Sequence, residues 1–304
     1  MVQELARSLM APSVSYRGKI TSPERWETWQ PKKGDVLVCT PPKCGTTWTQ
    51  TMAAMLLNGT TDLGAPVSVI SPWVDAALGA ADDVAKALSG QEGRRVVKTH
   101  TPADGFPIWE GVALIAVYRH PLDVFFSLRK HARNMKDNAD NPMNLPLGDA
   151  FAAFLSDPYD PDDFDRDSLA TIVRHYDQTV LKKRYPDLVP FHYADMISDQ
   201  NATVRSLARA IGCDADETLL SKVATATAFE TMRADAGKYV PEGGKGFWHD
   251  DSAFFDSGGA GKWHGKISEN DLAKYRARMA ELVPDAKARD WLENGNGGAL
   301  QRPL

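Results

Sequence analysis

The chain has 304 residues, of which 43% are hydrophobic and 25% charged, and its formal net charge is −5 at pH 7. This balance excludes general disorder, because there is ample apolar surface to bury. The sequence has no run of about 18 apolar residues without charges, which excludes a transmembrane helix. The mild acidity argues against general nucleic-acid binding but leaves room for a local basic pocket that binds a small anion.

The cysteines and the N-terminus bear on the cellular compartment. Cys39, Cys44 and Cys213 are too few and too scattered for a disulfide framework or a zinc site. The first ten residues, MVQELARSLM, include Glu4 and lack the apolar core of a secretory signal. We therefore expect a cytoplasmic protein without a metal site.

The first predicted elements are a strand and the helix that follows it. Residues 1–33 contain three prolines and are expected to be an irregular lead-in. The run 35–40, DVLVCT, is short, apolar and rich in β-branched residues, which predicts a buried strand. Apolar residues then recur at helical spacing from about Thr46 to Asn58, and Gly59 is expected to end that helix.

The rest of the chain continues the alternation of strands and helices. Strands are predicted at 94–99, 113–118 and 189–193, and a helix is expected to start at Pro121. Further helices are predicted at 166–184, 200–212, 215–226 and 269–293. We expect an α/β fold in which 1–304 form a single domain, with a mainly parallel central sheet flanked by helices, a core at about 34–293 and a tail at 294–304. Ligands of such sheets bind beyond the carboxyl ends of the strands.

The loop after the first strand predicts an anion cradle. It reads Pro42-Lys43-Cys44-Gly45-Thr46-Thr47-Trp48, so Lys43 brings a positive charge and Gly45 allows close backbone approach. An ordinary turn with a threonine cap is the simpler alternative, but such a turn requires neither the lysine nor the second threonine. The loop is not a Walker A motif, because its lysine precedes the glycine, and this makes a metal-dependent kinase less favoured.

The ends of the next two strands add further candidates. His100, in Lys98-Thr99-His100, is a candidate general base, although a lone histidine is more often a structural hydrogen-bonding group. Arg119 and Ser127, eight positions apart, could bind a second phosphate. The alternative for Arg119 is an ion pair with Asp123.

Together, these three strand ends resemble the cytosolic sulfotransferases that use 3′-phosphoadenosine 5′-phosphosulfate (PAPS). That family carries a Pro-Lys-Ser-Gly-Thr-Thr-Trp loop, a Lys-Thr-His segment, and an arginine followed eight positions later by serine. The resemblance extends from about residue 30 to 285 and includes the segments 191–196, 227–232 and 254–263. It implies a sulfotransferase fold related to that of the P-loop NTPases.

The resemblance also implies roles for individual residues. His100 is the implied general base, and Lys43 and Lys98 stabilise charge in the transition state. The implied donor-binding residues are Lys43, Cys44, Gly45, Thr46, Thr47 and Trp48 at the 5′-phosphosulfate, Arg119, Ser127, Gly258 and Gly259 at the 3′-phosphate, and Tyr193, Thr227, Ala228, Phe229, Met232 and Phe255 around the adenine.

The chain departs from the family pattern at three places. Cys44 replaces a serine at a helix N-terminus, which predicts a lowered thiol pKa and sensitivity to oxidation. Asp256-Ser257 stand where the family has Arg-Lys, and Lys262 stands where the family has aspartate. Nearby lysines that could compensate are Lys245, Lys262 and Lys266. The family's dimerisation segment is not recognisable, so the oligomeric state stays open.

The implied reaction moves a sulfuryl group from PAPS to a hydroxyl of a small-molecule or lipid-like acceptor, with 3′-phosphoadenosine 5′-phosphate (PAP) as product and without a metal. A nucleotide-dependent kinase and a non-catalytic nucleotide-binding protein remain as alternatives. Residues 134–164 are expected at the acceptor rim, with the acidic run 157–167 as a solvated loop or a mobile lid. Four aromatic residues could either line the acceptor pocket or pack in the core: Trp73, Phe106, Trp109 and Phe151.

Overall fold

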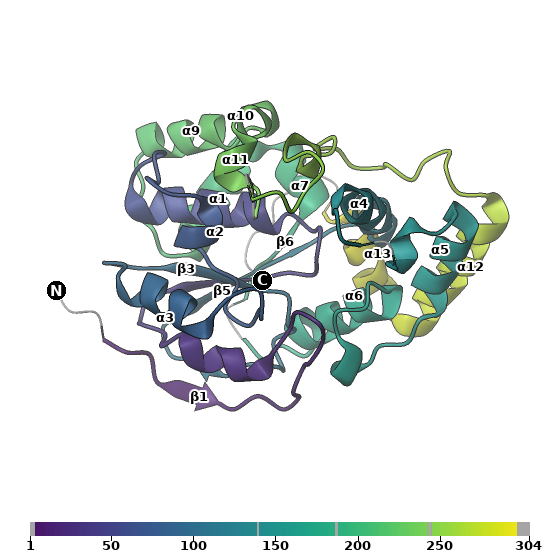
Figure 1. Cartoon of the computed structure of the whole chain (residues 1–304), viewed down its shortest axis with the longest axis horizontal. Coiled ribbons are helices and arrows are strands. Elements are labelled where there is room, and N and C mark those ends of the chain that lie inside the picture. Colours follow the sequence, from purple (N-terminus) through teal and green to yellow (C-terminus); the bar gives the residue numbers. More distant parts are fainter. Residues whose placement is uncertain (1–3, 139, 186–187, 242, 244, 297–304) are drawn as a thin grey trace.

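A four-stranded parallel sheet forms the centre of the computed structural model, which describes residues 4–138, 140–185, 188–241, 243 and 245–296 (Figure 1). Its strand order is β3-β2-β5-β6. The strands are β2 (Val36–Cys39), β3 (Val96–Thr99), β5 (Ala113–Tyr118) and β6 (Pro190–His192). The predicted α/β fold with a mainly parallel sheet is confirmed, and the four predicted strands are all present, β5 with the predicted bounds and the other three slightly shorter.

Both faces of the sheet are covered, which explains why the strands are uninterrupted apolar runs. In β2, Val36 and Val38 pack toward α1 (Thr46–Asn58), α8 (Gln200–Ala210) and α9 (Glu217–Ala226). Leu37 and Cys39 pack on the opposite face, toward η1 (Pro23–Thr28) and α3 (Ala81–Ser89). Figure 1 shows α1 and α9 on one side of the sheet and α3 on the other.

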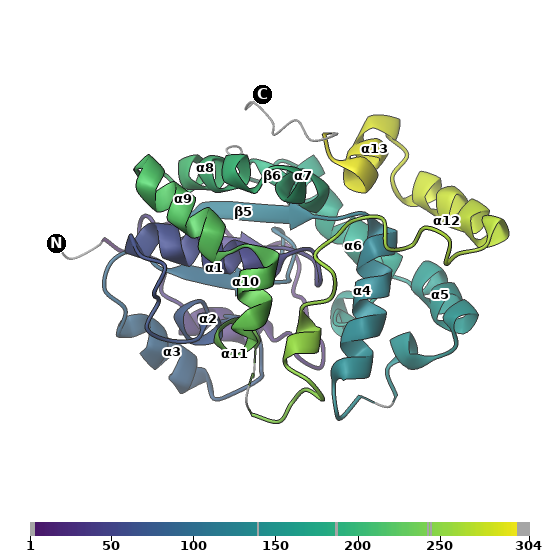
Figure 2. The ribbon, with the colours of Figure 1, turned by 90° about the horizontal axis from the view of Figure 1, so that it is seen from above.

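A second group of helices lies beyond the carboxyl end of β5 (Figure 2). Its helix α4 begins at Pro121, where the ring nitrogen Nδ1 of His120 accepts a hydrogen bond from the Leu122 amide at 3.1 Å. Tyr118, at the end of β5, packs in the core that these helices share. The group consists of α4 (Pro121–Asn134), α5 (Leu147–Ser156), α6 (Leu169–Tyr176), α12 (Glu269–Leu282) and α13 (Ala286–Asn294).

The continuous helix predicted at 269–293 is wrong, because the segment forms two helices. Pro284 follows α12, and a proline inside a helix removes a backbone donor and clashes with the preceding turn. Asp285 then caps α13, its carboxylate accepting from the amides of Lys287 and Ala288 at 2.8 Å. The helix predicted at 166–184 is shorter than expected, with α6 followed by a π-helical turn, η4 (Asp177–Leu181).

The lead-in is less irregular than predicted, because it contains η1 and a short strand, β1 (Ser8–Met10), that pairs antiparallel with β4 (Ile108–Trp109). All three residues of β1 are exposed, so the strand has no alternation of apolar and polar residues from which it could be predicted. Of the tail expected at 294–304, residues 297–304 lie outside the described residues. The remaining short elements are α2 (Val67–Ile70), α7 (Tyr193–Ser198), α10 (Phe229–Ala234), α11 (Ala236–Tyr239), η2 (Pro142–Asn144), η3 (Pro161–Asp163) and η5 (Ser252–Phe254).

None of the helices in the described ranges combines the length and the apolar character that crossing a membrane requires.

Candidate active site

A cavity of about 1330 Å³ opens beyond the carboxyl ends of the parallel strands. Predicted site residues from the end of every strand line it, and so do five residues from later in the chain. The first set is Lys43, Gly45, Thr46, Thr47 and Trp48 after β2, Lys98 and His100 at β3, Arg119 and Ser127 after β5, and Tyr193 after β6; the later residues are Thr227, Phe229, Met232, Phe255 and Gly258. The fold therefore brings residues that are more than 200 positions apart in the sequence around one space.

The loop between β2 and α1 has the backbone geometry of an anion cradle. Lys43 and Gly45 have φ angles of 64° and 102°, a left-handed turn that presents successive amides to one side. A Cβ atom at Gly45 would lie 3.1 Å from the Tyr193 ring, so the close approach itself requires glycine. Thr46 and Thr47 begin α1, where the first backbone N–H groups have no partner within the helix.

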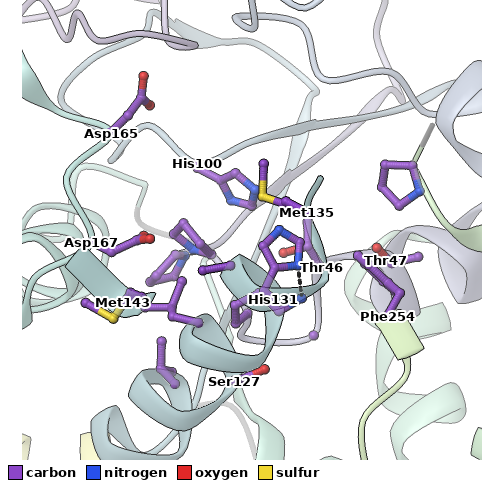
Figure 3. Close-up of a pocket in the computed structure, with 18 of the residues that line it drawn as sticks. Thr46, Thr47, His100, Ser127, His131, Met135, Met143, Asp165, Asp167 and Phe254 are labelled. Atoms are coloured by element: carbon purple, nitrogen blue, oxygen red, sulfur yellow. Dashed lines mark hydrogen bonds between the residues drawn. The ribbon is translucent and has the colours of Figure 1, made fainter. Parts of the chain in front are cut away.

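The Lys43 side chain is held by α4, through a contact that the sequence did not predict. Its Nζ lies 3.0 Å from Nδ1 of His131 and 4.3 Å from the centre of the Phe254 ring (Figure 3). Burial, followed by the charges of Arg119, Lys262 and Lys98, lowers the pKa of Lys43 to about 7. His131 lies one helical turn after Ser127 and also lines the cavity, so helical spacing from Ser127 was the available signal.

His100 has the arrangement of a neutral base. Its Nδ1 lies 2.7 Å from the carbonyl oxygen of Thr40. Because a carbonyl only accepts, Nδ1 carries the proton and Nε2 keeps its lone pair. Burial, with the positive charge of Lys98 next, lowers the pKa of His100 well below its usual value, so the imidazole is neutral at pH 7. Lys98 itself lies over the Trp73 ring at 4.6 Å, and burial lowers its pKa to about 8.

Arg119 lies beside the Lys43 loop, where its guanidinium donates to the Lys43 carbonyl at 3.4 Å. Its guanidinium donates to the carbonyl of Gly259 at 2.8 Å and lies over the Tyr193 ring at 4.4 Å. Its Nε is buried and has no hydrogen-bond partner, since the nearest carboxylate oxygen of Asp123 is 3.9 Å away. Asp123 instead accepts from the amides of Gly261 and Lys262, at 2.8 and 2.6 Å. The alternative of a simple Arg119–Asp123 pair therefore explains only part of this arrangement.

Two lysines offset the negative charge of Asp256, which stands where the family has arginine. The Asp256 carboxylate binds Lys262 at 2.5 Å and Lys130 at 2.8 Å. Lys262 is 10% exposed and lines the cavity, whereas Lys130 is 43% exposed. Lys266 lies over the Phe126 ring, and neither it nor Lys245 is among the lining residues. Lys262 is thus the compensating lysine that reaches the cavity, and its partner Asp256 lines the cavity with it.

Aromatic side chains line the cavity beside these cations. Trp48 donates from Nε1 to the Thr227 carbonyl at 2.9 Å and meets the Tyr193 ring edge-on at 5.8 Å. Tyr193 donates to the Gly258 carbonyl at 3.2 Å. A Cβ atom at Gly258 would lie 2.6 Å from the Phe229 ring, so glycine is required there. These contacts leave an apolar slot suited to a flat ring.

Three predicted binding residues lie next to the cavity without lining it. Cys44 is fully buried beneath the loop, Ala228 caps α10, and Gly259 turns its carbonyl to Arg119. Of the four candidate acceptor aromatics, Trp73 lines the cavity, whereas Phe106, Trp109 and Phe151 pack in the core.

The predicted reactivity of Cys44 is wrong. Burial raises the pKa of its thiol to about 12, outweighing the nearby charge of Arg119, so the thiolate is scarce at neutral pH. We expect iodoacetamide to label the partly exposed Cys213 of the native protein before Cys44, as followed by peptide mass spectrometry. Cys44 labelled first would contradict the buried, protonated thiol.

The acidic run 157–167 forms a wall of the cavity tied to the lead-in. The Asp165 carboxylate accepts from the amides of Ile20 and Thr21, at 2.6 and 2.9 Å, and from the Thr21 hydroxyl at 2.6 Å. Backbone hydrogen bonds join Arg17 to Pro161 and Phe164 at 2.7 and 2.9 Å. In the part of the chain that the structure describes, no group of three or more His, Cys, Asp or Glu side chains is placed to hold a metal ion.

Comparisons with known proteins identify relatives that are named as sulfotransferases. A glycolipid sulfotransferase of Mycobacterium bovis is 29% identical over 95% of this chain and 97% of its own length, and one of Mycobacterium tuberculosis has the same identity and coverage. Sulfotransferase 1C2 of Oryctolagus cuniculus is 26% identical over 68% of each chain.

Two solved structures share the fold. The structure of retinol dehydratase in complex with androsterone and inactive cofactor PAP has a TM-score of 0.67 at 18% identity and covers 89% of this chain and 83% of its own. Mouse sulfotransferase SULT7A1 complexed with PAP has a TM-score of 0.67 at 16% identity and covers 90% and 92%. The family model described as the sulfotransferase domain matches residues 33–287, and the chain therefore belongs to the sulfotransferase family.

Proposed function

We propose that this enzyme transfers a sulfuryl group from PAPS to a hydroxyl of a lipid-like or other small-molecule acceptor. The observation that carries the proposal is the set of cations that line one cavity, Lys43 after β2 and Arg119 after β5, beside the aromatic rings of Trp48 and Tyr193 and with the neutral His100 next to Lys98. PAPS has a matching form, because it carries anionic groups on both sides of a single adenosine. The similarity to glycolipid sulfotransferases favours a lipid-like acceptor.

The residues divide between the two ends of the donor. The Lys43 to Trp48 loop would hold the 5′-phosphosulfate, and Trp48, Tyr193 and Phe229 would enclose the adenine. Arg119 and Ser127 would hold the 3′-phosphate, together with Lys262. The unpartnered Nε of Arg119 fits this assignment, because a buried donor without an acceptor is costly.

The proposed step is an in-line transfer assisted by three side chains. Nε2 of His100 takes the proton of the acceptor hydroxyl as its oxygen bonds to sulfur. The bond between sulfur and the 5′-phosphate oxygen breaks, and PAP leaves with the electron pair. Lys43 and Lys98 stabilise the charge that develops on the leaving and transferring oxygens. The protonated His100 then returns its proton to solvent.

A titration of the purified protein by calorimetry tests the donor assignment. PAP is expected to bind more tightly than ATP with magnesium, because the proposed site binds the 5′-phosphate and the 3′-phosphate of PAP separately and ATP has no 3′-phosphate. Tighter binding of ATP with magnesium would favour the kinase and overturn the proposal. Transfer of labelled sulfate from PAPS to a panel of phenols and alcohols then separates an enzyme from a non-catalytic nucleotide-binding protein.

Lys262 is expected to contribute specifically to 3′-phosphate binding. Lys262→Gln should weaken PAP by roughly 10-fold or more, the value of one charge-assisted hydrogen bond, and should leave 5′-AMP, which lacks that phosphate, nearly unchanged. Lys130→Gln, at the more exposed partner of Asp256, is the matched control and should have a smaller effect. Equal losses for PAP and 5′-AMP with Lys262→Gln would refute the assignment.

A further inference from the structure

A single carboxylate stands out on the side of the cavity away from the adenine slot. Asp167 lies just before α6 and lines the cavity, and Figure 3 shows its carboxylate turned toward the region that holds His100 and His131. Apolar side chains form part of the cavity wall. They include Leu128, Ala132, Met135, Met143 and Ile172.

Neighbouring carboxylates are already satisfied, whereas that of Asp167 is not. Asp165 accepts three hydrogen bonds from residues 20 and 21, and Asp163 pairs with Arg166 at 2.7 Å. Within the described ranges, the Asp167 carboxylate makes no hydrogen bond or ion pair. Burial, and then the charge of Asp165, raises its pKa to about 7 against the opposing charge of Lys43. Asp167 is partly exposed and faces the cavity, so a ligand there can supply the hydrogen bond or the opposite charge that the protein does not supply.

The charges of the cavity wall indicate which kind of group this is. Among the described residues, the acceptor side is lined by six carboxylates and three cations. The carboxylates are Asp137, Asp140, Asp157, Asp163, Asp165 and Asp167, and the cations are Lys19, Lys136 and Arg166. The donor side carries Lys43, Lys98, Arg119 and Lys262 against one carboxylate, Asp256, which pairs with Lys262. The cavity is thus cationic where the donor's phosphates are placed and acidic at the opposite side, which favours a cation in the acceptor.

We propose that Asp167 binds a protonated alkylamine of the acceptor and so selects amphiphilic amino-alcohols or aminoalkylphenols. In this assignment, which rests on the proposed function, the apolar body lies against Met135 and Met143 and the hydroxyl faces His100. The amine stays protonated, so it is not the nucleophile, and sulfate is transferred to oxygen. Asp167 is therefore a specificity-determining residue rather than a second base.

Matched acceptors test the proposal by binding rather than by turnover. Calorimetry on the PAP-saturated enzyme would compare 4-(aminoalkyl)phenols of increasing chain length with 4-alkylphenols of the same length. At the best length, the wild-type protein should bind the amine at least about 10-fold more tightly, as expected for a charge-assisted contact. Asp167→Asn, which keeps the size of the side chain, should remove that preference.

Asp163→Asn is the matched control, because Asp163 already pairs with Arg166, and it should keep the preference for the amine. The proposal is overturned if no amine binds more tightly than its alkyl partner, or if Asp167→Asn retains the wild-type ratio. It is also overturned if Asp167→Asn weakens the binding of 4-(hydroxyalkyl)phenols and not that of the amines, since Asp167 would then bind a neutral hydroxyl.

The proposed sulfuryl transfer and the proposed role of Asp167 would fail through different results. If PAP does not bind and PAPS sulfates no phenol, the proposed function fails. If PAP binds and simple phenols are sulfated without any preference for the amine, only the role of Asp167 fails.

Discussion

Replacing His100 with alanine or glutamine is expected to lower kcat by roughly 10²- to 10⁴-fold, the usual contribution of a general base. The reason is geometric, because Nδ1 is held by the Thr40 carbonyl and Nε2 alone can accept the proton. PAP should bind either variant nearly as it binds the wild type, since the proposed role of His100 is to act on the acceptor hydroxyl. Steady-state sulfate transfer and calorimetry with PAP measure the two quantities separately.

The pH profile adds an independent check on His100. A base must be neutral to act, and burial lowers the pKa of this imidazole. Activity should therefore be retained as the pH falls through 6.5 and be lost only below it, where the ring becomes protonated. A His100→Gln variant that keeps wild-type kcat would contradict the assignment of His100 as the base.

Replacing Lys43 with methionine is expected to lower kcat by roughly 10²- to 10³-fold, comparable to the loss of one oxyanion-stabilising donor. Methionine fills much of the space beside Phe254 but provides no charge for the leaving phosphate. Lys130→Met, which removes an exposed lysine of α4, is the control and should keep most of the turnover. Single-turnover transfer from PAPS measures the effect on the chemical step.

The same lysine predicts an alkaline limit for the free enzyme. Its pKa is lowered to about 7, and its charged form is the one that acts, so kcat/KM should decline as the pH rises through that value. The bound donor is anionic and raises the pKa again, so kcat should decline at higher pH than kcat/KM. A Lys43→Met variant with unchanged single-turnover rate would remove Lys43 from the chemistry.

Much of the fold and of the donor site could be predicted because the signals are local. Each strand is a short apolar run, and each polar group that follows it is placed at the same edge of the sheet by parallel topology. The loop at Lys43, His100 at β3 and Arg119 at β5 could all be recognised in this way. They line one cavity as expected.

The acceptor side could be predicted only as segments: residues of 134–164 and of the acidic run 157–167 line the cavity, but their individual contacts depend on tertiary packing. His131 becomes significant only once α4 places it beside Lys43. Asp167 belongs to an acidic run whose neighbour Asp165 is bound by the distant lead-in, and this leaves Asp167 without a partner. The Cys44 prediction failed for a similar reason: its position at a helix N-terminus lowers a thiol pKa, but burial outweighs that effect.

A crystal structure of the protein grown with PAP would test most directly whether one nucleotide spans both cationic regions. The expected electron density has the 5′-phosphate on the amides of residues 45–48 near Lys43 and the 3′-phosphate within hydrogen-bond distance of Arg119, with the His100 ring open to the acceptor side. A nucleotide that contacts only one of these regions, or none, would contradict sulfuryl transfer at this site.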